Sequence, residues 1–137
     1  MAFFAALPLM FVVWLIYNAV VLVGSPETLD LGLFTVDLMS GAVWTLHVRE
    51  LLLILGLVAL YLEIFKATRT SVSSVVNHTL SMVAFIAFLV EFIIYAPAGN
   101  STFMLLGLMA LMDVVAGFTV TIVAARRDFS VGDQGGL

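Results

Sequence analysis

The chain has no cysteine, three prolines in 137 residues, and charged side chains at only 10% of its positions. The absence of cysteine excludes disulfides, thiolate metal sites and cysteine-based catalysis. Soluble domains carry about 25% charged residues, so a chain with so few cannot cover a surface that faces water. Because 64% of the residues are hydrophobic and the mean hydropathy is +1.23, we expect a single membrane domain surrounded by lipid.

Basic residues are also scarce, with 5 Lys and Arg against 9 Asp and Glu and a net charge of −4. This balance argues against nucleic acid as a partner and against docking on anionic lipid through a basic patch. The sequence has no phosphate-binding loop, dinucleotide fingerprint, nucleophile elbow or HExxH motif. His47 and His78 are expected about 25 Å or more apart along their helices, too far to ligate one haem. We therefore expect no cofactor and no metal.

Four apolar runs have the length of a membrane span, for which about 20 residues suffice. They cover residues 2–23, 42–65, 72–95 and 101–125. The first run has no basic start and contains Tyr17 and Asn18, so we interpret it as a retained helix rather than a signal peptide. Pro97 and Gly99 mark a tight turn that makes the last two runs antiparallel neighbours. The sequence thus predicts an all-α integral membrane protein with four transmembrane helices in an antiparallel bundle.

Two of the segments outside the four apolar runs are the loop 24–40 and the tail 128–137. Residues 25–27 have the order of a helix N-terminus, Ser-Pro-Glu, whereas residues 29–33 alternate like an extended segment. Both readings stay open for the loop 24–40, which we expect to be external. Glycines at three positions of the tail 128–137 predict a mobile cytoplasmic end.

The basic residues predict the orientation in the membrane. Four of the five lie in the linker 66–69 and at 126–127, which fall on one side of a four-span bundle. The positive-inside rule then places both termini in the cytoplasm and the acidic loop outside. We expect an inner, cytoplasmic membrane of the bacterial type.

Each predicted span contains polar residues, which are costly inside a bilayer. Helical rise places Glu91 and Asp113 about 20 Å from the cytoplasmic boundary, and Asn18 and Arg49 about 25 Å from it. We therefore expect one polar layer in the outer half of the bilayer, made of Asn18, Arg49, Glu50, Glu91 and Asp113. One arginine facing up to three acids leaves carboxylates that must reach water, take up a proton or hold a cation.

Small residues share the helix faces of the two acids in the last spans. They are Ala84 and Ala87 beside Glu91, and Ala110, Gly117 and Ala124 beside Asp113. Such faces let another helix approach closely, so we expect packing within the chain or against a second copy. Glu63 is expected to pair locally with Lys66 at the cytoplasmic edge.

Three function classes remain open. The first is a small transport or channel protein in which Arg49, Glu91 and Asp113 handle protons or cations, as a homo-oligomer because four helices enclose little room. The second is a non-catalytic subunit of a larger membrane complex, in which an Arg49–carboxylate pair fixes the helix register. The third is an enzyme acting on a lipid or quinone. It is the weakest, because no nucleophile or metal constellation accompanies the acids.

Overall fold

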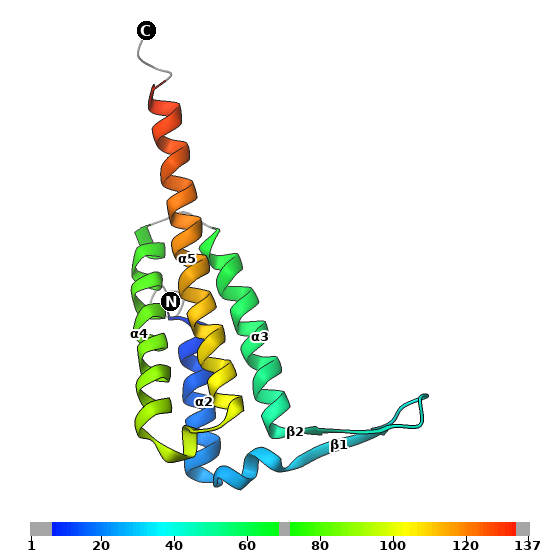
Figure 1. Cartoon of the computed structure of the whole chain (residues 1–137). Helices are drawn as coiled ribbons and strands as arrows, with labels where there is room; N and C mark the ends of the chain where they lie inside the picture. The colour runs from blue at the N-terminus through cyan, green and yellow to red at the C-terminus, as the bar shows by residue number, and fades with distance from the viewer. Residues whose placement is uncertain (1–6, 69–71, 134–137) are drawn as a thin grey trace.

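A computed structural model describes residues 7–68 and 72–133 of the chain (Figure 1). Over these residues four α-helices run alternately up and down as a bundle, and a two-stranded hairpin projects from one end. The elements are α2 (Leu9–Val23), η1 (Pro26–Asp30), β1 (Gly32–Asp37), β2 (Val43–His47), α3 (Val48–Ala67), α4 (Val72–Ile94), η2 (Ala96–Ala98) and α5 (Ser101–Asp133). The predicted helical character is confirmed, and the four helices are accompanied by a small two-stranded sheet that the prediction did not contain.

Large side chains fill the centre of the bundle, where α5 packs against both α3 and α4. The Phe103 ring lies 4.7 Å from the Tyr17 ring and 5.2 Å from the Phe88 ring, centroid to centroid, and all three side chains are buried. The outer surface is apolar as well: Tyr61 is 67% exposed and Ile93 71%. The helices therefore carry large apolar side chains both in the core and on the outer surface.

Two helices in the described part of the chain are long and apolar enough to cross a membrane, Val75–Ile94 and Ser101–Ser130. The helix α2 is apolar but has 15 residues. The helix α3 has 20 residues and carries charged side chains near both ends. Length and composition therefore favour a membrane for the α4–α5 pair most directly.

The hairpin corrects the expected start of the second span, because residues 42–47 belong to a strand and its turn rather than to a helix. Antiparallel pairing sets Val36 opposite Trp44 and Thr35 opposite Thr45, so apolar and polar pairs alternate with the period of two typical of a strand. Gly41 closes the turn with a φ of 84°, a conformation that favours glycine. The loop 24–40 contains η1 followed by β1, so the short helix and the extended segment both occur, one after the other.

Two other boundaries differ from the prediction. Helix α2 begins at Leu9 because Pro8 precedes it in an extended conformation, and residues 1–6 lie outside the described residues. Helix α5 continues past 125 to Asp133, so residues 128–133, expected in a mobile tail, are helical; residues 134–137 also lie outside the described residues. Figure 1 shows this end of α5 extending beyond the other helices.

Candidate functional site

The carboxylate of Glu63 links three helices. Its side chain is 0% exposed, and Oε1 accepts hydrogen bonds from the backbone N–H of Leu9 at 2.6 Å and from Lys66 Nζ at 2.9 Å. Its other oxygen, Oε2, accepts a hydrogen bond from Asn77 Nδ2 at 3.1 Å. Leu9 is the first residue of α2, so the carboxylate also interacts favourably with the positive end of that helix. The buried charge of Glu63 is therefore fully compensated by its neighbours.

Asp113 of α5, the fourth helix, lies near Glu63 and Lys66. Its side chain is 3% exposed, interacts electrostatically with Glu63 and Lys66, and lies beside Ser81. Asp113 Oδ2, Ser81 Oγ and Asn77 Oδ1 are buried without a hydrogen-bond partner among the residues that the structure describes. We name Glu63, Lys66, Asn77, Ser81 and Asp113 the Glu63–Asp113 cluster.

The chemistry of this cluster follows from its charges and its unpaired oxygens. With both acids ionised, two carboxylates face one ammonium group. Buried polar atoms without a partner are costly, so the cluster favours any proton or cation that would reach them. Across residues 7–68 and 72–133, no group of three or more His, Cys, Asp or Glu side chains is placed to hold a metal ion.

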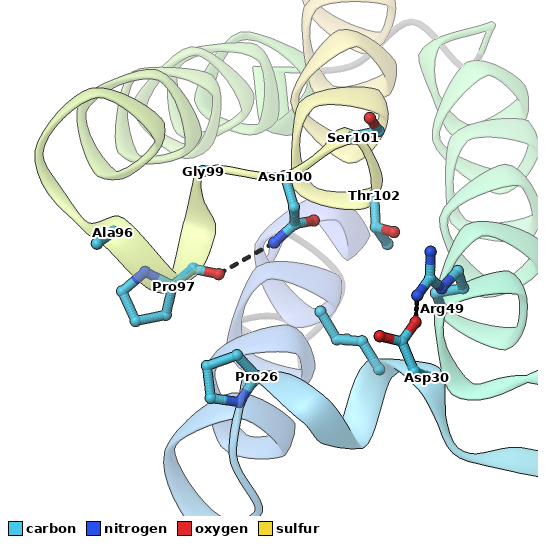
Figure 2. Close-up of a pocket in the computed structure, with 10 residues that line it drawn as sticks. Pro26, Asp30, Arg49, Ala96, Pro97, Gly99, Asn100, Ser101 and Thr102 are labelled. Carbon is cyan, nitrogen blue, oxygen red and sulfur yellow. Dashed lines mark hydrogen bonds and ion pairs between the residues drawn. The ribbon is translucent and has the colours of Figure 1, made fainter.

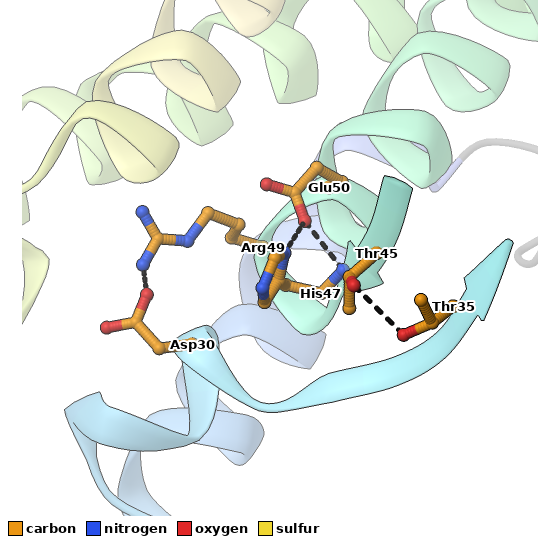
Figure 3. Close-up of polar contacts among 6 residues, drawn as sticks. All are labelled: Asp30, Thr35, Thr45, His47, Arg49 and Glu50. Carbon is orange, nitrogen blue, oxygen red and sulfur yellow. Dashed lines mark hydrogen bonds and ion pairs between the residues drawn. The ribbon is translucent and has the colours of Figure 1, made fainter. Parts of the chain in front are cut away.

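Charged residues of the predicted layer lie instead at the hairpin end of the bundle. Arg49, in the first turn of α3, forms an ion pair with Asp30 of η1, and both side chains are partly exposed (Figure 3). Glu50 Oε2 accepts a hydrogen bond from the backbone N–H of His47 at 2.7 Å and lies 3.0 Å from Nδ1 of the His47 ring. His47 and Glu50 together form a capping box at the start of α3. The expected pairing of Arg49 with an acid of the last two helices is therefore wrong.

A cavity of about 620 Å³ opens beside this ion pair, between η1, η2 and the start of α5 (Figure 2). Asn100 lines it, accepts a hydrogen bond from the backbone N–H of Phe103 at 3.0 Å and so caps α5. Its Nδ2 donates to Pro97 O at 3.0 Å and to Tyr17 Oη at 2.6 Å. Asn100 thus ties α2 to the turn between α4 and α5, which is a structural role.

The structure joins two members of the predicted layer and separates the rest. Asn18 Nδ2 donates to Glu91 Oε2 at 3.2 Å. Glu91 lies about 5 Å along α4 from the turn that joins α4 to α5, whereas Asp113 lies about 18 Å along α5 from it. The two acids therefore differ in height by about 13 Å, and the single layer becomes two.

The small residues mostly pack inside the chain. Ala84, Ala110 and Gly117 are buried, and Ala87 and Ala124 are partly buried. A Cβ at Gly117 would overlap the ring of His78, so that glycine makes room for a neighbouring helix. This face is occupied by the chain's own helices and is not free for a second copy.

Sequence reasoning found the Glu63–Lys66 pair but placed Glu63 at an edge and left Asn77 and Ser81 out of the site. A signal was present: Asn77, Ser81, Ala84 and Phe88 recur at helical spacing and form one buried face of α4. Comparison of the chain with protein-family models, with curated proteins and with solved structures finds no match. Function must therefore be inferred from this geometry.

Proposed function

We propose that this chain is a small polytopic membrane protein that moves protons or monovalent cations, with the Glu63–Asp113 cluster as its ion-handling site. The observation that carries the proposal is Asp113, which is 3% exposed and has an oxygen without a partner in the described part of the chain. The neighbouring Glu63 already takes Lys66 as its counter-ion. Acids inside membrane helices are rare, and they mark proton relays and ion pathways.

The proposal places all four helices across the bilayer. The apolar outer surface and the two helices of sufficient length support this placement. By the positive-inside rule, the linker 66–69 and the projecting end of α5 lie in the cytoplasm, and the hairpin lies outside. The membrane would be a bacterial inner membrane.

A homo-oligomer is part of the proposal, because a bundle of four closely packed helices leaves little room for a pathway. The small-residue face of α5 is already used within the chain, so self-association would use another surface. Helix α3 offers one, since Leu57, Val58 and Tyr61 are each more than half exposed.

Reconstitution tests the ion-moving function directly. Vesicles containing the protein and an entrapped pH-sensitive or Na⁺-sensitive dye receive an imposed gradient, and the rate of dissipation is compared with that of empty vesicles. We expect flux with the wild type, loss of flux in Asp113→Asn, and retention in the matched variant Glu91→Gln, whose carboxylate lies in the other polar layer. The wild type matching empty vesicles, or Asp113→Asn matching the wild type, would refute the proposal.

A second candidate function is that of an accessory subunit in a larger membrane complex. The projecting hairpin favours it, because Val36 and Trp44 are 40% and 44% exposed on one of its faces and Met39 is fully exposed at its tip. Co-purification of another membrane protein at fixed stoichiometry, reduced by Trp44→Ser and unchanged by Thr45→Ser on the opposite face, would support this function. Absence of any such partner from native membranes would remove it.

A further inference from the structure

We infer that the Glu63–Asp113 cluster binds one Na⁺ ion, an inference that rests on the proposed function and names its ion. Three oxygens carry it: Asn77 Oδ1, Ser81 Oγ and Asp113 Oδ2. Each belongs to a side chain that is at least nine-tenths buried, and none has a hydrogen-bond partner among the residues described.

The three oxygens belong to two helices that pack against each other. Asn77 and Ser81 are four residues apart on α4 and so share one face of it. Asp113 of α5 lies beside Ser81 and interacts with Glu63, to which Asn77 is hydrogen-bonded. Because Asn77 uses its Nδ2 to bind Glu63, its oxygen is the atom of the amide that has no partner among the described residues.

The chemistry of the donors selects a hard cation. Amide, hydroxyl and carboxylate oxygens are the ligands that such ions prefer, and the three unpaired atoms include neither sulfur nor imidazole nitrogen. Soft and borderline metals are therefore poor candidates for this site.

The charge selects a monovalent ion. Glu63 and Asp113 together carry two negative charges when ionised, and Lys66 supplies one positive charge, which leaves one negative charge in the cluster. One Na⁺ ion neutralises it, whereas a divalent ion would leave an uncompensated positive charge in the interior.

The arrangement also favours a cation over a proton. A proton on Asp113 would donate one hydrogen bond and so reach one other oxygen directly. A cation contacts several oxygens at once, and oxygens that share an ion lie around it instead of bonding one another. Such a cation reaches Asn77 Oδ1 as well, whereas a proton on Asp113 is shared with Ser81 alone.

Thermal unfolding of the full chain in mild detergent tests the inference, with Na⁺ replacing choline at constant ionic strength and pH. A ligand that binds only the folded state raises its stability with the logarithm of concentration above Kd. We expect Tm to rise with Na⁺ and to stay constant in choline. Asp113→Asn should abolish the rise, and Ser81→Ala should raise the half-saturating Na⁺ concentration about tenfold.

The matched control is Glu91→Gln, which changes a carboxylate outside the cluster and should keep the full Na⁺ response. If Asp113→Asn does not fold, Ser81→Ala decides alone, because it leaves both acids and Lys66 in place. A Tm that depends on pH but not on Na⁺ would overturn Na⁺ binding and leave proton movement as the proposed function. Insensitivity to both, together with no vesicle flux, would overturn both.

Discussion

Replacing Glu63 with alanine should be the most damaging single change in the bundle outside its apolar core. The carboxylate is 0% exposed and accepts hydrogen bonds from Leu9 at the start of α2, from Lys66 on α3 and from Asn77 on α4. Removing it leaves a buried donor on Asn77 and a partly buried donor on Leu9 unpaired, and it leaves the Lys66 ammonium group without its counter-ion. Three helices would lose their shared polar contact at once.

The magnitude follows from these contacts. Breaking a buried charge pair by removing one partner costs about 3–5 kcal/mol. Because the Lys66 side chain is 33% exposed and can still reach water, we expect the lower end, about 3 kcal/mol. Glu63→Gln keeps the acceptor oxygen for Leu9 and Lys66, and its Nε2 can donate to Asn77 Oδ1 if Asn77 turns its amide, so only the charge is lost and we expect a cost of about 1–2 kcal/mol.

Equilibrium unfolding of the purified protein in detergent, followed by tryptophan fluorescence, measures these differences. The matched control is Glu91→Gln, which weakens one hydrogen bond from Asn18 at a partly exposed site and should cost about 0.5–1 kcal/mol. Equal free energies of unfolding for Glu63→Ala and Glu91→Gln would refute the view that the cluster joins the helices.

Three further predictions concern other contacts. Gly117→Ala should destabilise by about 1–3 kcal/mol because its Cβ overlaps the His78 ring, and His78→Ala in the same chain should recover most of that loss in thermal unfolding. Tyr17→Phe removes the link from α2 to Asn100 and Pro97 and should cost about 1 kcal/mol; an unchanged Tm would contradict a structural role for that hydroxyl. In a Trp14→Phe background, brominated lipid should quench Trp44 if the apolar face of the hairpin lies on the bilayer, whereas quenching by aqueous iodide alone would place it in water.

Much of the helical architecture could be predicted, because apolar runs and a Pro-Gly turn are local signals. The hairpin could not, since Val43, Trp44 and Leu46 are as apolar as the helix that follows them. Only the alternation of Thr35 and Thr45 with apolar neighbours distinguishes strand from helix there, and it spans few residues. The end of α5 was missed because glycines near 132 suggested flexibility, while Arg126 and Arg127 favour a helix.

The sequence predicts acids inside the bundle, but it does not predict which residues surround Asp113. Buried acids with an excess of negative charge are present, yet the partners of Asp113 are Glu63, Lys66 and Ser81 rather than Arg49. The prediction counts depth from the ends of α4 and α5 that lie away from their shared turn, and these two helices differ in length. The tight turn between these two helices is the better origin, because both must start from it at one height.

The length of α5 has a practical consequence. Thirty-three helical residues extend about 50 Å, whereas the hydrocarbon of a bilayer is about 30 Å thick, so in the proposed membrane placement about 20 Å of continuous helix would extend beyond the lipid. A fluorescent reporter joined after Asp133 would be held by a rigid helix instead of a flexible linker. Energy transfer from such a reporter to dyes in the headgroup region would then report a narrow range of distances. Placing the dyes in one leaflet at a time would show on which face of the membrane the end of α5 lies.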